Sequence, residues 1–365
     1  MHPFKRDEIL ILLGAGASSD AGIPHSAKMI QEVESLIKEA RDWACFKDLY
    51  NYVRSSIYHS EGIRGRFGND VNYNIERLVN TLNEIAKKRE HTLYPFVGAW
   101  DPTLAEVAGR DFELVVRLRN EILRRLREKW LPRKGYSASA GYLKNIIKLQ
   151  QEFAHPLRVF TLNYDLCVER TCAEAVIERG FRKDTGTWDW RQFIDNVEEP
   201  NIYLYKLHGS TDWTYDKDTD DLIYFDDPDG IEDDDAAMIF GTSYKLEYRD
   251  PFLFLAYQFR QWTLETRIIV SIGYGFGDEH INKIIQQALN RDKQRLLLSI
   301  SPFEDKRTEA DQRADIARTI PYRNPEQIIC GSFCAREFMS QHLCLGYLAQ
   351  LLPAPVEPFL VVSTN

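Results

Sequence analysis

The sequence "EILILLGAGASSDAGIP", residues 8–24, joins an apolar run to a series of very small residues. Residues 8–13 predict a buried strand, and the glycines after it allow the backbone to approach a ligand closely. Gly14-Ala15-Gly16 supplies the first two glycines of a dinucleotide fingerprint, whereas Ser19 stands where the third is usual. The stretch therefore predicts either a phosphate-binding turn before a helix or an ordinary tight strand-to-helix turn.

Several later apolar runs also end on glycine or polar residues, and helical patterns separate them. One of these patterns predicts a helix through 166–180, and the alternating sequence "TDWTYDKDTDDLIYF" (211–225) predicts a hairpin. The alternation of apolar runs and helical patterns predicts an α/β fold: a Rossmann-like parallel sheet with helices on both faces. Ligands of such sheets bind beyond the carboxyl ends of the strands, so these ends predict one shared site. The polar ends are Gly14–Ser18, Asn163–Asp165, His208–Ser210, Gly241–Ser243 and Gly273–Gly277.

The domain organisation follows from the same patterns. Apolar residues at spacings of three and four predict a helical lobe inserted at about 29–151, within a domain that spans 1–301. Residues 302–365 form a C-terminal extension. Its apolar stretch "FMSQHLCLGYLAQLL" (338–352) predicts either a helix for oligomerisation or partner docking, or one packed in the core.

Bulk composition narrows the function classes. The net charge of −9 argues against direct nucleic-acid binding as the main role. No apolar stretch is long enough to span a bilayer, and "MHPFKRDE" is not a secretory signal, so we expect a cytoplasmic protein without membrane contact. The 6 cysteines contain no Cys-x-x-Cys pair, so they suggest neither a zinc knuckle nor a disulfide framework.

Five motifs together resemble the sirtuin superfamily, and more closely its prokaryotic SIR2-like branch. They are "GAGASSDAGIP", "TLNYD", "KLHGS", "FGTS" and "GYGFGDEHIN", in the family's order over roughly residues 8–300. The resemblance implies that NAD is bound as a substrate in a Rossmann-like catalytic domain beside a smaller lobe. It also implies cleavage of the bond between nicotinamide and ribose.

Two departures from the protein-deacetylating sirtuins refine this expectation. Those proteins usually follow "AGIP" with Asp-Phe-Arg, whereas here "HSAKMI" follows. They also carry a four-cysteine zinc module after the catalytic histidine, but this chain has no cysteine between Cys172 and Cys330. We therefore expect no zinc, and the departures fit the SIR2-like proteins that consume NAD in bacterial anti-phage defence.

Three residues are candidates for catalysis. His208 can act as a general base, because an imidazole titrates near neutral pH and can accept a proton from water or a ribose hydroxyl. Asn163 resembles the family's asparagine that holds the ribose or the attacking water, a task for an amide that both donates and accepts. Asp165 matches a family position near the nicotinamide carboxamide, or it caps the next helix.

The remaining candidates are expected to bind NAD. The first loop cradles the pyrophosphate, the residues before the first long helix shape the nicotinamide pocket, and two later turns contact the adenosine side. These residues are Gly14, Ala15, Gly16 and Ser18, then Ile23 and Pro24, and finally Gly241, Thr242, Ser243, Gly273 and Gly275. Asp278 is expected to cap the helix that follows.

The favoured function is therefore an NAD⁺ glycohydrolase that depletes NAD. The alternatives are an NAD-dependent protein deacylase, a non-catalytic NAD or ADP-ribose-binding regulatory module, and an ADP-ribosyltransferase. Such an effector must stay silent until triggered, and the chain has no recognisable sensor domain of its own. The resemblance thus implies control by homo-oligomerisation or by a separately encoded activator such as an HerA-like ATPase.

Overall fold

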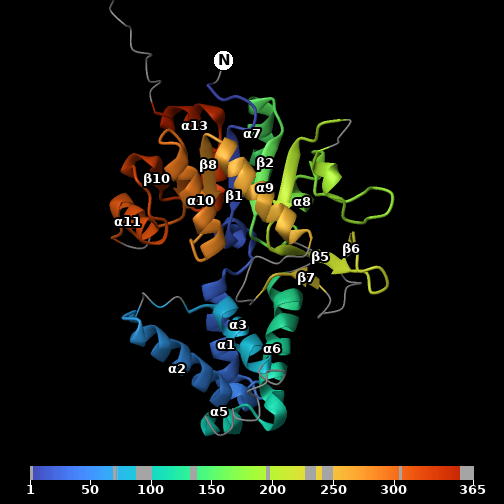
Figure 1. Cartoon of the computed structure of the whole chain (residues 1–365), viewed down its shortest axis with the longest axis vertical. Helices are drawn as coiled ribbons and strands as arrows, with labels where there is room; N and C mark the ends of the chain where they lie inside the picture. Colours follow the sequence, from blue (N-terminus) through green and yellow to red (C-terminus); the bar gives the residue numbers. More distant parts are fainter. Residues whose placement is uncertain are drawn as a thin grey trace, which may run out of the picture.

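A seven-stranded parallel sheet forms the centre of the molecule, with strand order β10-β9-β8-β1-β2-β4-β3 (Figure 1). The computed structural model describes residues 3–68, 71, 73–87, 101–131, 138–194, 198–226, 236–240, 250–303 and 306–353. The predicted α/β class with a Rossmann-like parallel sheet is confirmed. The strands are β1 (Ile9–Leu13), β2 (Leu157–Thr161), β3 (Ile177–Glu178), β4 (Ile202–Lys206), β8 (Ile268–Ile272), β9 (Leu296–Ile300) and β10 (Ile328–Gly331).

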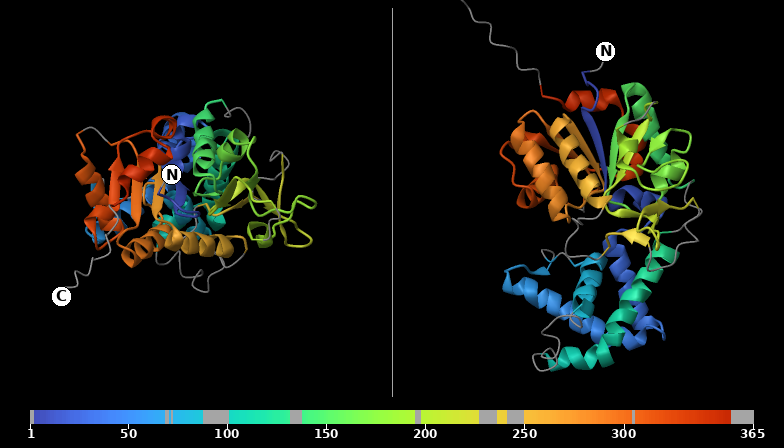
Figure 2. Two further views of the ribbon diagram at one scale, coloured as in Figure 1. Left: turned by 90° about the horizontal axis from the view of Figure 1, so that it is seen from above. Right: turned by 45° about the vertical axis from the view of Figure 1, so that its right-hand side comes forward.

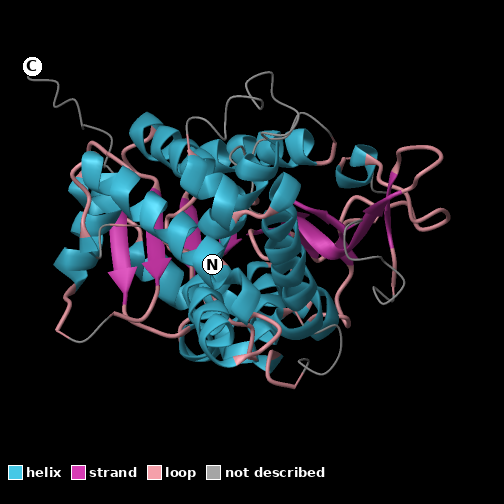
Figure 3. Cartoon of the chain, turned by 90° about the horizontal axis from the view of Figure 1, so that it is seen from below, coloured by secondary structure: helices cyan, strands magenta, loops and turns pink. Residues whose placement is uncertain are grey.

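Helices cover both faces of this sheet (Figures 2 and 3). Every residue of β1 is buried, because alternate side chains enter separate cores on the two faces. Leu10 and Leu12 share a core with α9, α10 and α11, whereas Ile9 and Ile11 share one with α7, α8, α12 and α13. The bounds are α7 (Asn145–Phe153), α8 (Cys167–Thr171), α9 (Phe252–Glu265), α10 (Glu279–Arg291), α11 (Glu309–Thr319), α12 (Ala335–Gln341) and α13 (Leu345–Leu351).

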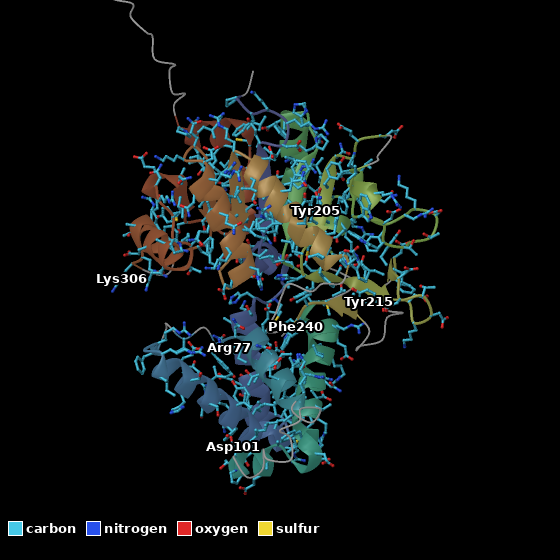
Figure 4. All side chains as sticks on the ribbon, in the orientation of Figure 1. Arg77, Asp101, Tyr205, Tyr215, Phe240 and Lys306 are labelled. Carbon is cyan, nitrogen blue, oxygen red and sulfur yellow. The ribbon has the colours of Figure 1, made fainter. Side chains whose placement is uncertain are left out.

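A helical lobe lies beyond the carboxyl ends of the strands (Figure 1). Its helix α3 buries Ile75, Leu78, Val79 and Leu82, which share one face of an amphipathic helix. Phe240 lies between the lobe and the sheet (Figure 4) and belongs to a core cluster that includes residues of both. The lobe contains α1 (Ser26–Glu39), α2 (Lys47–Ile63), α3 (Ile75–Lys87), α5 (Pro102–Val107), α6 (Glu113–Arg125) and the π-helical turn η6 (Leu126–Trp130).

A small antiparallel sheet with order β6-β5-β7 lies beside the main one. It consists of β5 (Gly209–Tyr215), β6 (Leu222–Tyr224) and β7 (Ala236–Met238), and it contains the hairpin predicted from the alternating sequence. This corrects one expectation. The strand before "FGTS" does not end at the carboxyl edge of the parallel sheet, because β7 pairs with β5 instead.

Two further segments can be compared with the sequence expectations: residues 166–180 and the C-terminal extension. The helix predicted through 166–180 stops at Thr171, because the chain turns and forms β3, which pairs with β4. In the C-terminal extension, β10 is the outermost strand on its side of the main sheet. Phe338 and Leu348, on α12 and α13, are fully buried in the core cluster on one sheet face. The apolar stretch 338–352 therefore packs within the chain.

A buried carboxylate stabilises the upper part of the lobe. Glu61 accepts hydrogen bonds from Arg64 at 3.3 Å and Arg77 at 2.8 Å, and it also pairs with Arg66. Arg66 first, and then Arg77, hold the pKa of Glu61 below its usual range, against the opposing effect of burial.

We predict that Glu61→Gln destabilises the protein near pH 7. Because the pKa of Glu61 is lowered in the folded state, its stabilisation is present above the unfolded value of about 4.3 and is lost as pH falls through the folded pKa. Urea unfolding across this pH range should show the variant and wild type converging at low pH. The control is Glu121→Gln, which removes a partly exposed pair with Arg124 and should change stability little. Equal stability of Glu61→Gln and wild type at pH 7 would contradict the prediction.

Candidate functional site

The carboxyl ends of four neighbouring strands are in register. Leu13 of β1 pairs with Thr161 of β2 and with Ile272 of β8, and Thr161 pairs with Lys206 of β4. The residues just beyond these ends therefore lie along one edge of the sheet. They include Gly14, Asn163, His208 and Gly273, so the structure brings together candidates from four of the five predicted strand ends.

Backbone contact between two glycine loops marks the centre of this edge. Cβ atoms added to Gly14 or Gly16 would lie 2.5 Å and 2.7 Å from the Cα atoms of Tyr274 and Gly273. The Gly16 N–H donates to the Gly273 carbonyl at 2.9 Å. These glycines thus allow the loops after β1 and β8 to pack against each other. The crossover after β1 leads to β2, whereas the crossover after β8 leads to β9 on the opposite side, and ligands of such sheets usually bind at this point of reversal.

Asn163 is fixed to the first loop. Its Nδ2 donates to the Gly14 carbonyl at 2.9 Å and to Ser18 Oγ at 3.0 Å, and its own N–H donates to Thr161 Oγ1. The amide group is therefore directed at Gly14 and at η1 (Ala15–Ala21), the 3-10 helix that follows it. The side-chain carbonyl is the acceptor that Asn163 retains for another group.

His208 is buried and paired with a carboxylate. Its Nε2 lies 2.9 Å from Oδ2 of Asp278, and the two side chains are 5% and 4% exposed. The Tyr164 ring lies beside the imidazole, with centroids 6.2 Å apart. The Ile239 N–H donates to the His208 carbonyl, so the segment after β7 lies against this histidine.

Asp165 is buried and acts at the start of α8. Its Oδ1 accepts from the N–H of Cys167, the first residue of α8, at 2.9 Å, while the N-cap position of that helix is occupied by Leu166. Its carbonyl accepts from the buried Lys206 ammonium, which also pairs with Glu169 at 2.9 Å. These bonds tie the end of β4 to the loop after β2.

Two buried tyrosines lie near the pair formed by His208 and Asp278: the Tyr164 ring is beside His208, and the Tyr274 hydroxyl donates to the Asp278 carbonyl. Burial raises the pKa of Tyr164 and of Tyr274 well above the usual value, and negative charge on Glu76 and Asp278 adds to this effect. Glu76 lies on α3 of the helical lobe. The lobe therefore contributes charge to the site, a contribution that sequence patterns did not indicate.

The other predicted binding residues differ in accessibility. Ser18 and Ile23 are buried, whereas Pro24 and Gly273 are half-buried. Ala15 and Gly275 are exposed, and a Cβ on Gly275 would meet no atom within 4 Å. The predicted adenosine-side residues Gly241, Thr242 and Ser243 lie outside the described residues.

Sequence reasoning missed the partner of His208. Asp278 was predicted to cap a helix, and its Oδ1 does accept from the N–H groups of His280 and Ile281 at the start of α10. The other carboxylate oxygen bonds His208, 70 residues away in the sequence. The sequence indicated that Asp278 begins a helix. Its contact with His208 could not be predicted, because that contact depends on the order of the strands in the sheet.

The described part of the chain contains neither a metal-binding cluster nor a membrane-spanning helix. There, no group of three or more His, Cys, Asp or Glu side chains is arranged to hold a metal ion. Among the same residues, no helix has both the length and the apolar character required to cross a bilayer.

Part of the chain is similar to a known domain family. The family model described as a SIR2-like domain matches residues 157–320, and no curated protein matches the chain. The matched span contains Asn163, Asp165, His208 and Asp278.

Solved sirtuin structures resemble the chain over most of its length. A mutant Sir2 homologue with 2′-O-acetyl-ADP-ribose is 12% identical, covers 95% of this chain and 94% of its own, and has a TM-score of 0.41. A Sir2 homologue–NAD complex is 13% identical, with 94% and 90% covered and a TM-score of 0.41. Sir2 bound to an acetylated peptide is 11% identical, with 91% and 90% covered and a TM-score of 0.42.

We predict that Gly273→Ala strongly destabilises the protein, whereas Gly275→Ala is tolerated. At Gly273 the φ angle is +66°, and an added Cβ would lie 2.2 Å from the Ala17 nitrogen, so the two loops would have to separate. Gly275 has neither constraint. Thermal unfolding of both variants tests the difference, and equal melting temperatures would rule out loop packing as the reason for glycine at 273.

Proposed function

We propose that this protein is an NAD⁺ glycohydrolase, which converts NAD⁺ and water to nicotinamide and ADP-ribose. One observation carries the proposal: Asn163 and His208 lie just beyond neighbouring strand ends, beside the glycine loops at the point where the crossovers diverge. The match of a SIR2-like domain to the segment that contains both residues supports the same chemistry.

The residues at this edge suit a dinucleotide. The loop at Gly14–Ser18 contains only glycine, alanine and serine, so its backbone N–H groups can approach a ligand closely. This loop is the candidate binding site for the pyrophosphate. Ile23 and Pro24, at the entry to the helical lobe, are the candidate wall of the nicotinamide pocket, and Gly273 and Gly275 are candidates for the adenosine side. Asp165 stays a candidate near the carboxamide through its position after Asn163, although its Oδ1 is bonded to the Cys167 N–H.

The proposed reaction needs a base and a positioning group more than an acid. The bond between ribose C1′ and the nicotinamide nitrogen breaks, and its electron pair stays with the ring, which leaves as a neutral molecule. Water forms the new bond to C1′, and its proton passes to His208. The carbonyl of Asn163 is suited to orient this water or a ribose hydroxyl, because its amide hydrogens are held by the loop.

The resemblance of the five motifs to the SIR2-like branch also suggests a biological role for this protein. NAD depletion of this kind serves anti-phage defence in the SIR2-like branch, where activity is held back until a trigger acts. We accordingly propose control by homo-oligomerisation or by a separately encoded HerA-like ATPase. Sedimentation of the protein alone and with such an ATPase tests this part separately from the chemistry.

The chemistry is tested by incubating the purified protein with NAD⁺ and quantifying nicotinamide and ADP-ribose. We expect release by wild type, alone or once the activating ATPase is added, and under the same condition a loss of about 10²–10⁴-fold for His208→Ala, the range of a general base. A comparable loss is expected for Asn163→Ala. His59→Ala, at an exposed histidine of the lobe, is the matched control and should retain full activity.

Other outcomes separate the alternatives. Undiminished turnover by a folded His208→Ala protein would refute the proposed mechanism. Formation of O-acetyl-ADP-ribose when an acetylated peptide is added would identify a deacylase. Saturable NAD⁺ binding without turnover, even with the ATPase present, would favour a regulatory binding module.

A further inference from the structure

The carboxylate of Asp278 is held by two different groups. One oxygen, Oδ1, accepts from the backbone N–H groups of His280 at 3.0 Å and Ile281 at 3.3 Å, at the start of α10. The other, Oδ2, lies 2.9 Å from Nε2 of His208. The helix thus fixes the orientation of the carboxylate, and the carboxylate in turn fixes the edge of the imidazole that faces it.

Further buried hydrogen bonds surround this aspartate. The Tyr274 hydroxyl donates to the Asp278 carbonyl and contacts the Asn282 side chain at 2.8 Å, and Asn282 Nδ2 donates to the Phe276 carbonyl at 2.8 Å. Phe276 has a φ of +54°, a left-handed conformation that is uncommon for a residue with a side chain. These bonds and this backbone conformation define the path of the loop "GYGFGD" (273–278), whose last residue is Asp278.

The pairing decides which imidazole nitrogen can accept a proton. A carboxylate is an acceptor only, so the nitrogen bonded to it must carry the hydrogen. With the hydrogen on Nε2, the neutral ring has its lone pair on Nδ1. The same ring without Asp278 would be free to hold its proton on either nitrogen.

We infer that Asp278 is a positioning residue that holds His208 in the Nε2–H tautomer and so makes Nδ1 the base of the site. The assignment of Nδ1 as the base rests on the proposed function, whereas the tautomer itself does not. On this inference the glycine-rich loop after β8 delivers a carboxylate to the histidine after β4, in addition to any contact with NAD.

Asp278→Asn is the decisive variant, because asparagine caps a helix about as well as aspartate. The helix N–H groups require the amide carbonyl as their acceptor, so the NH₂ group of asparagine must face His208. A donor at that position requires an unprotonated Nε2, and the imidazole hydrogen moves to Nδ1. The variant should thus keep the helix start and reverse the tautomer.

Nitrogen-15 NMR of protein labelled at its 8 histidines measures the tautomer of His208 directly. The chemical shifts of Nδ1 and Nε2 differ between the two tautomers. The His208 signal is assigned by its loss in His208→Gln. We expect the Nε2–H tautomer in wild type and the Nδ1–H tautomer in Asp278→Asn. Asp101→Asn is the control, since Asp101 caps α5 through the Leu104 N–H and lies in the lobe; it should leave His208 unchanged.

Activity gives the second readout. Asp278→Asn should lower kcat for NAD⁺ by about 10²-fold or more, the range of a lost general base, while KM stays close to that of wild type. An Nδ1–H or doubly protonated His208 in wild type would overturn the inference, and so would an unchanged tautomer in a folded Asp278→Asn protein. If wild type shows the Nε2–H tautomer but never hydrolyses NAD⁺, the proposed function fails and the positioning of His208 stands.

Discussion

Backbone packing between the loop at Gly14–Gly16 and Gly273 is the constraint on which the rest of the site depends. Side chains at these positions would force the ends of β1 and β8 apart, because the added atoms would overlap backbone rather than flexible side chains. Each loop also leads to a residue that bonds one of the two proposed catalytic side chains. The loop after Gly14 leads to Ser18, which bonds Asn163, and the loop after Gly273 leads to Asp278, which bonds His208. The two halves of the candidate site are thus built on one close approach.

Support for the first loop comes from three distant parts of the chain. Asn163 bonds its beginning, and the Tyr142 hydroxyl donates to the Ala17 carbonyl at 2.6 Å. From α12, Arg336 bonds the side chain of Asp20 through its backbone N–H and the carbonyl of Asp20 through its guanidinium. The C-terminal segment therefore buttresses the loop at the candidate site. A partner that pulled on α12 would act on this loop through hydrogen bonds.

Much of the fold could be predicted from the sequence, because buried parallel strands are uniformly apolar and amphipathic helices repeat every three or four residues. The strands at Ile9–Leu13 and Ile268–Ile272 are examples. Prediction failed where pairing decides the outcome: β7 joins β5, and a two-residue strand replaces the end of the helix expected at 166–180. In the site, residue types indicated His208 and the cap at Asp278. Their mutual hydrogen bond could not be read from the sequence, because it joins separate strand ends.

The charges around His208 suit the reaction that we propose. As neutral nicotinamide leaves, positive charge grows on the ribose, and a fixed negative potential lowers the free energy of that state. Burial first, and then the charges of Asp278 and Glu76, raise the pKa values of the neighbouring Tyr164 and Tyr274. The nearby cation Lys206 is paired with Glu169 and with the Asp165 carbonyl, so its charge is offset. Glu76 lies on α3, so one of these negative charges comes from the helical lobe.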